Sequence, residues 1–559
     1  MSVRYGSDVV VDLLCEAGVE YVAFNPGATF RGIHDSLVHA DQGPKIVLCP
    51  HESIAVAAAH GYAKAAGKPM AVLLHDVVGL QNASMAIYNA WCDRVPILLI
   101  GGTGPMSKPE RRPWIDWIHT ALVQGQQVRD YVKWDDQPAD LASLPESFAR
   151  AWTTMLAAPN GPVYLCVDVG IQEKEVPVGF RWEPVHSYAV PTPPSPTNES
   201  VAQISEALSH ARLPVIVTDY AGSTKTGFEA LLRLAEQLAS PVVDCGRRLC
   251  FPTAHDLSFG EEIIQDADVI LALDVEDPSG ALLGSRPEAR VFNVTPAHLK
   301  LRSWAHDYQQ LRPVERHVTA TCDTALPVLL DACAVEDHIR SDRRARLAER
   351  ASSARAAWRA HAVGMATSDG AVAPGALAAV LGDKLADERW TVVHGSLGGW
   401  ERRLWRFERY GQHLGSHGGG GLGYGAGASI GAVLGLPDDE LAVNVQPDGD
   451  FLYTPAALWT AARYRVPLLI VMNNNRQYQN TVEHATRIGE ARRSSTERRY
   501  HGAALDDPPI DFAALARSFG IWATGPVTDM DAGQEALEQA LAVVRGGNAA
   551  LVDVVTTGA

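Results

Sequence analysis

The chain has 559 residues, of which 47% are hydrophobic and 20% charged, and its formal net charge at pH 7 is −17. This length exceeds what one hydrophobic core serves, so we expect three or four domains. The composition excludes a disordered or fibrous chain, and the acidic balance argues against nucleic acid or an anionic membrane as a partner. No apolar run reaches the roughly 18 residues that span a bilayer, and the N-terminal segment lacks the apolar stretch of a signal peptide. We therefore expect a cytoplasmic protein without a membrane segment.

Eight cysteines are scattered along the chain without CxxC spacing. This pattern predicts neither a zinc site nor a disulfide framework. We expect the cysteines to be small buried apolar residues in a reducing compartment.

Short apolar segments rich in Val, Ile and Leu alternate with helix-like segments from end to end. Strands that are apolar on both faces and separated by helices are typical of a parallel sheet covered on both sides. The strand-like segments are residues 19–26, 45–50, 69–75, 95–102 and 161–169 in the first third, 213–222, 240–246, 267–275 and 289–296 in the middle, and 390–396, 439–450, 466–474 and 549–555 in the last third.

Two features suggest domain boundaries. Residues 190–200 (VPTPPSPTNES) contain four prolines and predict a linker, since proline cannot continue a helix or an inner strand. A charged, alanine-rich helical stretch over 338–362 leads into the segment GMATSDGAVAPG, and we place a second boundary in this region. We thus expect an α/β protein of three doubly wound parallel-sheet domains, covering residues 1–185, 186–340 and 341–559.

The most informative pattern lies in the last third. The apolar strand 441–445 runs into QPDGD (446–450), and the apolar strand 466–472 ends in three asparagines (473–475). The carboxyl ends of neighbouring parallel strands bind ligands in such folds. Carboxylate, amide and carbonyl oxygens suit magnesium holding a diphosphate, and a helix that opens after Gly449 favours an anion. On the residues alone, a plain turn at Asp448 and a plain strand end at the asparagines explain the pattern equally well.

This unit resembles the thiamine-diphosphate binding motif, in which GDG is followed by NN at the spacing of 27 positions that separates Asp448 from Asn475. The resemblance implies that the side chains of Asp448 and Asn475 and the backbone carbonyl of Gln477 bind magnesium. It also places Gly449, Asp450 and Tyr478 against the cofactor. The sequence departs from the motif twice: Pro447 replaces its first glycine, and RQYQ (476–479) replaces the usual GxYG.

Residues 48–102 resemble the pyrimidine-binding domain of decarboxylase-like and acetolactate-synthase-like thiamine-diphosphate enzymes. Glu52 opens the helical segment after strand 45–50, as a glutamate does in that family. The resemblance implies that its carboxyl hydrogen-bonds the pyrimidine nitrogen and thereby promotes the tautomer that activates the cofactor. On its own, Glu52 is better explained as an acid that stabilises a helix N-terminus.

A glycine-rich segment, SHGGGGLGYG (416–425), lies between the two halves. It is a weak dinucleotide fingerprint because no acidic residue stands correctly beyond it. It resembles the family's GGLG segment, which implies that Gly421 and Leu422 contact the cofactor and that Leu422 wedges it into a V shape. A glycine-rich helix start packed on a sheet fits the same residues. By the same resemblance, Gly395 and Ser396 lie near the diphosphate or the pyrimidine.

Further candidates for the cofactor and substrate follow strands of the first third. His75 matches a histidine that benzoylformate decarboxylase-like members use for proton transfer. Those members have a serine where Ala28 stands, whereas benzaldehyde lyase-like members have alanine, which favours carboligation or carbon–carbon cleavage. The resemblance also places Pro26 beside the cofactor, and Gln81 and Asn82 against the cofactor of a facing subunit.

The resemblance covers nearly the whole chain and implies a lyase or transferase that depends on thiamine diphosphate and Mg²⁺. Its substrates would be small 2-oxo acids or aldehydes, and its reaction a non-oxidative decarboxylation, a carboligation, or both. An acetolactate synthase-like carboligase, a 2-hydroxyacyl-CoA lyase or oxalyl-CoA decarboxylase, and a catalytically silent cofactor-binding protein remain open. In this family the cofactor bridges two subunits, which implies at least a homodimer and favours a homotetramer. The middle third lacks GxGxxG and a basic cluster for coenzyme A, so we expect it to be a scaffold.

Overall fold

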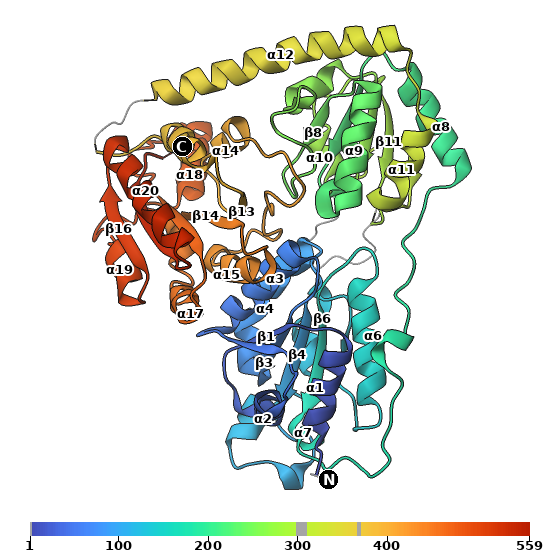
Figure 1. The fold of residues 1–559 in the computed structure, drawn as a ribbon, viewed down its shortest axis with the longest axis vertical. Coiled ribbons are helices and arrows are strands. Elements are labelled where there is room, and N and C mark those ends of the chain that lie inside the picture. Colours follow the sequence, from blue (N-terminus) through green and yellow to red (C-terminus); the bar gives the residue numbers. More distant parts are fainter. Residues whose placement is uncertain (1–2, 298–309, 366–369, 559) are drawn as a thin grey trace.

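The structure, a computed structural model, describes residues 3–297, 310–365 and 370–558. Each third of the chain forms a sheet covered by helices (Figure 1), and every strand pair in the three sheets is parallel. The expected α/β fold of three parallel-sheet domains is therefore confirmed.

The first sheet has the strand order β2-β1-β3-β4-β6-β5. Its strands are β1 (Tyr21–Phe24), β2 (Lys45–Leu48), β3 (Ala71–His75), β4 (Leu98–Thr103), β5 (Asp135–Asp136) and β6 (Val163–Asp168). The helices around it are α1 (Gly6–Glu16), α2 (Arg31–His39), α3 (Glu52–Ala66), α4 (Asp76–Cys92), α5 (Ile115–His119), α6 (Leu144–Leu156) and α7 (Val169–Gln172). The residues of β4 are buried throughout, as expected for a strand covered on both faces.

The middle sheet has the order β12-β11-β10-β7-β8-β9. Its strands are β7 (Pro214–Thr218), β8 (Val242–Asp244), β9 (Ser258–Phe259), β10 (Val269–Leu273), β11 (Arg290–Val294) and β12 (Arg316–Val318). Its helices are α8 (Asn198–His210), α9 (Lys225–Leu238), α10 (Pro278–Ala281) and α11 (Cys322–Ala332). Residues 190–197 of the predicted linker form neither helix nor strand, whereas residues 198–200 already belong to α8.

Helix α12 (Asp337–Gly364) connects the middle and third domains and runs along the outside of both (Figure 1). Its first two turns contain residues 340 and 341, so the chain is helical where we placed the second boundary. The segment that follows it includes residues 366–369, which lie outside the described residues. The three domain ranges themselves remain predictions.

The third sheet has the order β13-β14-β15-β17-β16. Its strands are β13 (Trp390–His394), β14 (Leu441–Pro447), β15 (Leu468–Asn474), β16 (Trp522–Val527) and β17 (Ala550–Val555). Its helices are α13 (Pro374–Leu385), α14 (Trp400–Leu404), α15 (Gly425–Gly435), α16 (Asp448–Phe451), α17 (Ala457–Arg463), α18 (Gln479–Arg492), α19 (Phe512–Ser518) and α20 (Met530–Arg545).

Helices α3 and α15 join the first domain to the third (Figure 1), and one hydrophobic cluster continues through both. Both helices carry small residues on their shared face. A Cβ atom on Gly431 would lie 1.7 Å from the carbonyl oxygen of Ala58, and one on Gly61 would lie 1.9 Å from that of Ala428. The two backbones approach this closely only because these positions are glycines.

Two other sequence expectations can be compared with the structure. Among the described residues, no helix combines the length and apolar character needed to cross a membrane. All eight cysteines are free, and most are buried. The expectation of buried cysteines is wrong for Cys15 and Cys245, which are exposed, because Cys15 is the last residue but one of α1 and Cys245 follows the end of β8.

Candidate active site

Strands β13, β14 and β15 are neighbours, so their carboxyl ends lie side by side. Gly395 follows the first of these strands, Asp448 the second and Asn475 the third. Gly395 has φ +106°, and a Cβ atom there would lie 1.6 Å from the carbonyl oxygen of Val445, so this close turn requires glycine. The predicted ligand residues of the third domain therefore share one edge of the sheet, the edge where such folds bind ligands.

Asp448 is buried, and its carboxylate is incompletely satisfied. Its Oδ1 accepts a hydrogen bond of 2.8 Å from the backbone N–H of Gly449, whereas its buried Oδ2 has no partner among the described residues. Burial raises the pKa of this carboxyl, and the backbone N–H groups of Gly449, Arg476 and Gln477 partly oppose the rise. The resulting pKa is about 6. The carboxylate thus lies beside the turn that carries Asn475 and Gln477. A buried carboxylate oxygen without a partner is what a cation site requires.

The three asparagines after β15 have different surroundings. The Nδ2 of Asn473 donates to the carbonyl oxygen of Ser396 (3.2 Å), and that of Asn474 donates to Oδ1 of Asp553 (2.9 Å). The Oδ1 of Asn475 accepts from the backbone N–H of Gln477 (3.1 Å) and closes the turn beside Asp448. Asn473 and Asn474 therefore tie the strand end to its neighbours, whereas the amide oxygen of Asn475 bonds only within its own turn. An amide oxygen, a carboxylate oxygen and a backbone carbonyl form a hard donor set that fits magnesium.

Both departures from the sequence motif are compatible with this geometry. Pro447 has φ −66°, the value that its ring imposes, so proline fits the strand end without distortion. Arg476 has φ +58°, in the left-handed region that glycine adopts freely. The glycine of the usual motif matches this conformation, and arginine adopts it at a cost of about 1 kcal/mol.

The glycine-rich loop is held in place by α4 and by Asp450. Asn89 forms two hydrogen bonds of 3.0 Å with the backbone of Gly421, one as donor and one as acceptor. The Oδ1 of Asp450 accepts from the backbone N–H of Gly423 (2.8 Å), and its Oδ2 accepts from Nε2 of Gln446 (2.6 Å). Leu422, between these anchors, is 40% exposed although it is apolar. An exposed leucine on a firmly held loop is consistent with the predicted wedge against a ligand.

Glu52 lies at the corresponding edge of the first sheet, where β2, β1 and β3 are neighbours. Its side chain is only 3% exposed and lies at the first position of α3. The Nδ2 atoms of Asn25 and Asn82 donate to its two oxygens at 3.2 and 3.0 Å. Gly79 passes close by, since a Cβ atom there would lie 3.3 Å from Oε1. An acid that served only the helix N-terminus would not need two side-chain amides from other elements.

His75 is the last residue of β3. The neighbouring strand β1 is followed by Pro26 and Ala28, which are both exposed. The Nδ1 of His75 lies 3.0 Å from Oγ1 of Thr29, and the His75 ring packs edge-on against that of His119, with centroids 5.7 Å apart. Burial lowers the pKa of His75, and the nearby His119 lowers it further. His75 is therefore held as a neutral imidazole with one nitrogen engaged by Thr29. Such a group can give or take a proton at its other nitrogen.

The structure brings the predicted residues together in two groups. Glu52, Asn82 and His75 belong to the first domain, and Gln81 is exposed one position before Asn82. Gly395, Ser396, Asp448, Asn475, Gln477 and Tyr478 form the second group, and Tyr478 lies against Gly449. No hydrogen bond among the described residues joins Glu52 to Asp448 or Asn475, so a single chain does not link the groups through these side chains.

Sequence reasoning missed His119 and Asn89. His119 lies on α5, a five-residue helix in a long irregular segment after β4. Its Nδ1 is buried, with no hydrogen-bond partner in the described part of the chain. No periodicity marks that segment, so only the fold shows that it returns to His75. Asn89 could have been noticed as a polar residue beside the apolar residues Ile87 and Ala90 near the end of α4.

Comparisons with known proteins fit this geometry. The N-terminal TPP binding domain of thiamine pyrophosphate enzymes matches residues 4–126, and the C-terminal TPP binding domain matches residues 394–554, together just over half of the chain. The chain belongs to the thiamine pyrophosphate enzymes. Each of the two matched domains contains one of the residue groups described above.

Several thiamine pyrophosphate enzymes are similar over most of their length. A benzoylformate decarboxylase from Pseudomonas aeruginosa is 28% identical over 96% of both chains. Acetolactate synthase 1 from Nicotiana tabacum is 26% identical over 88% of this chain and 74% of its own. Among solved structures, a thiamine diphosphate-dependent 4-hydroxybenzoylformate decarboxylase from Rhodococcus jostii has a TM-score of 0.78 at 21% identity, over 99% of both chains. A benzoylformate decarboxylase from Polynucleobacter necessarius has a TM-score of 0.77 at 19% identity, with the same coverage.

Proposed function

We propose that this thiamine diphosphate-dependent enzyme decarboxylates a small 2-oxo acid without oxidation, and that it can transfer the resulting acyl carbanion equivalent to a second carbonyl compound. The observation that carries the proposal is the pair of buried carboxyls. Glu52 is held by two amides at one sheet edge, and Asp448 has an unsatisfied oxygen at another. The relatives named above support the reaction class, because they include benzoylformate decarboxylases and acetolactate synthases.

The residues of the third domain would hold the cofactor. Asp448, Asn475 and the carbonyl of Gln477 would bind Mg²⁺, which would neutralise a diphosphate. Gly395, Ser396, Gly449 and Tyr478 would line the diphosphate, and Gly421 and Leu422 would shape the bend of the cofactor. Asp450 would act indirectly, by holding the glycine-rich loop, because its two oxygens accept hydrogen bonds from Gly423 and Gln446.

The residues of the first domain would supply proton transfer. When bound, thiamine diphosphate supplies a carbanion that attacks a carbonyl carbon and an electron sink for decarboxylation. Glu52 would hold a proton at the pyrimidine nitrogen, and Asn25 and Asn82 would orient it. His75 would move a proton to or from the substrate at the nitrogen that Thr29 does not engage. Pro26, Gln81 and Asn82 would line the same region.

A carboligase is the second candidate function. Ala28 offers no hydroxyl to a substrate carboxylate, and alanine at this position also occurs in benzaldehyde lyase-like enzymes by the resemblance described above. An acetolactate synthase-like carboligase would carry FAD, which the absorption spectrum of the purified protein would show. A coenzyme A-dependent lyase would bind coenzyme A tightly. A catalytically silent protein would bind the cofactor and turn over no substrate in a panel of 2-oxo acids and aldehydes. The cytoplasmic location stays a prediction.

Two substitutions test the proposed cofactor site. We expect Glu52→Gln to retain cofactor binding and lose most activity, roughly 100-fold or more, because the carboxyl is replaced by a group that cannot exchange the proton. Glu146→Gln is the matched control, because Glu146 is an acid in the first turn of another helix of the same domain. If Glu52 only stabilised its helix, the two variants would behave alike, and near-wild-type turnover of Glu52→Gln would refute its role.

We expect Asp448→Ala to abolish the Mg²⁺-dependent retention of thiamine diphosphate, because it removes the charged ligand. Asp439→Ala is the matched control, since Asp439 is an exposed acid in the turn before β14. Titration calorimetry with thiamine diphosphate and Mg²⁺ measures both variants. An unchanged cofactor affinity in Asp448→Ala would rule out the metal site.

A further inference from the structure

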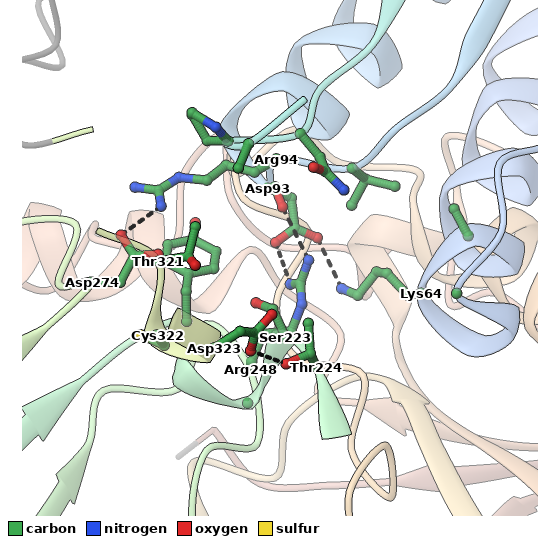
Figure 2. Close-up of a pocket in the computed structure, with 18 of the residues that line it drawn as sticks. Lys64, Asp93, Arg94, Ser223, Thr224, Arg248, Asp274, Thr321, Cys322 and Asp323 are labelled. Atoms are coloured by element: carbon green, nitrogen blue, oxygen red, sulfur yellow. Dashed lines mark hydrogen bonds and ion pairs between the residues drawn. The ribbon is translucent and has the colours of Figure 1, made fainter. Parts of the chain in front are cut away.

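A cavity of about 450 Å³ lies where the three domains meet (Figure 2). Residues of α3 and the end of α4 line it from the first domain, and the loops after β7 and β8 line it from the middle domain. Residues 410–414 close it from the third domain. Its wall contains a cluster of buried charges that none of the roles proposed above uses.

Asp93 is the centre of this cluster and has no exposed side-chain surface. Lys64 and Arg248 both form ion pairs with its carboxylate, Lys64 at 2.9 Å, and Nη2 of Arg248 also donates to the backbone carbonyl of Asp93 at 3.0 Å. His60 contacts the same carboxylate through Nε2 at 2.6 Å. Figure 2 shows Lys64 and Arg248 pointing toward Asp93 from two domains. Two cations thus share one carboxylate, and the buried cluster carries a net positive charge.

The same lysine reaches the glycine-rich loop of the third domain. Its Nζ donates to the carbonyl oxygen of Ser416 at 2.8 Å, although its side chain is only 3% exposed. Arg247, next to Arg248, donates to the carbonyl oxygen of Gly418 at 2.8 Å. A Cβ atom on Gly418 would lie 2.5 Å from the backbone nitrogen of Asp93, so the loop is pressed against the cluster. The first turn of the loop that carries Leu422 is therefore held by charged donors from the other two domains.

We propose that Lys64 is a positioning residue for the cofactor loop, residues 415–423, and that its charge state sets how tightly the enzyme holds thiamine diphosphate. The proposal rests on the proposed cofactor site, because it needs Leu422 and Gly421 to contact the cofactor. A charged Lys64 holds the carbonyl of Ser416 with a charge-assisted hydrogen bond, whereas a neutral amine holds it with an ordinary one. The loop loosens when the ammonium loses its proton.

The cluster allows that proton loss near neutral pH. Burial lowers the pKa of Lys64, Asp93 opposes this and Arg248 adds to it, and the resulting pKa is about 7. Loss of the proton leaves a neutral pair, Asp93 with Arg248, which costs less in a buried site than a net positive charge. Lys64 is charged below this pKa and neutral above it, so cofactor affinity falls as the pH rises through about 7.

The groups that face Lys64 do not titrate in the same range. Burial lowers the pKa of each neighbouring histidine, so these rings are neutral near pH 7, and burial raises the pKa of the Tyr424 phenol. Opposite charges keep Asp93 and Arg248 ionised. The groups are His60, His394, His413, His417, Tyr424, Asp93 and Arg248. A change in loop anchoring above pH 7 is thus attributed to Lys64.

The first experiment measures the dissociation constant of thiamine diphosphate with saturating Mg²⁺ from pH 6 to 9, by tryptophan fluorescence. We expect the affinity of the wild type for thiamine diphosphate to fall about tenfold more between pH 6 and 9 than the affinity of Lys64→Arg, because arginine stays charged. Lys64→Met should bind at least tenfold more weakly than wild type at pH 6, and the difference should become smaller at pH 9, where the neutral amine of the wild type keeps only an ordinary hydrogen bond. Lys133→Met is the matched control, because Lys133 is a half-buried lysine of the same domain whose pKa burial also lowers, to about 8, but which bonds Ala157 instead of the loop.

The second experiment follows the loop without the cofactor, by hydrogen exchange of residues 415–423 in wild type, Lys64→Met and Lys64→Arg at pH 6 and 8.5. At pH 8.5 we expect the loop of the wild type to be less protected from exchange than that of Lys64→Arg. In Lys64→Met we expect the loop to lack this protection at both pH values. Equal protection in all three chains would overturn the proposal. If protection changes as expected but no chain binds thiamine diphosphate, the proposed function fails while the anchoring of the loop stands.

Discussion

Asp448 and Asp450 stand two positions apart on one turn, yet their surroundings give them opposite tasks. Asp448 keeps one buried oxygen without a partner among the described residues, whereas both oxygens of Asp450 accept hydrogen bonds from the protein. A carboxylate that is fully engaged stabilises the fold around it, and one that is not creates a site for a cation. Both residues are aspartates of one turn, so the residue type does not distinguish them. Their roles differ because Gly423 and Gln446 donate hydrogen bonds to Asp450.

His119 affects His75 electrostatically. We expect His119→Gln to raise the pKa of His75, since it removes a nearby ring that can carry a positive charge, while burial continues to hold that pKa below its usual value. The acid limb of the pH–rate profile should move to higher pH in the same direction. Titration of the His75 ring by NMR, in the protein without substrate, measures the shift.

His39→Gln controls for the loss of a histidine as such, because His39 is an exposed residue of the same domain. It should leave the pKa of His75 unchanged. An unchanged or lower pKa of His75 in His119→Gln would show that the two rings do not interact as their 5.7 Å separation indicates.

At the scale of elements, the contact between α3 and α15 determines how the two cofactor domains meet in one chain. We expect Gly431→Ala to lower the free energy of unfolding by about 2 kcal/mol, because its Cβ atom would collide with the carbonyl of Ala58 and force the helices apart. Denaturant unfolding followed by circular dichroism measures the change. Gly364→Ala, at the end of α12, has open space around it and should stay within about 0.5 kcal/mol of wild type. Similar stabilities for the two variants would mean that α3 and α15 can move apart at little cost in free energy.

The strands and the ends that carry Glu52, His75, Asp448 and Asn475 could be predicted from the sequence, because buried parallel strands leave continuous apolar runs and polar residues at their ends. The anchoring of the glycine-rich loop could not. Lys64, Asn89 and Arg247 are separated from it by more than 160 positions and lie on elements whose local pattern says nothing about that partner. Likewise, the left-handed backbone at Arg476 follows from the turn beside Asp448 and not from its residue type.

At the scale of the whole molecule, the two halves of the proposed site are held by different contacts. The charged cluster at Asp93 joins all three domains of one chain, and α3 with α15 fixes the first domain against the third. Yet no hydrogen bond in the described part of the chain links Glu52 to Asp448 or Asn475, which follow β14 and β15. We predict that the site is shared between two copies of the chain, with each copy presenting one half to its partner.

Mixing two inactive variants tests this arrangement. If the cofactor lies between Glu52 of one subunit and Asp448 of another, a mixed dimer of Glu52→Gln and Asp448→Ala chains contains one site with both substitutions and one with neither. Refolding or co-expressing the two chains in equal amounts should then restore about a quarter of the wild-type activity, since about half of the dimers are mixed and each has one of its two sites intact. Each variant alone, treated in the same way, gives the baseline. If both residues acted within one chain, every site in the mixed dimer would carry one substitution, and mixing would restore nothing.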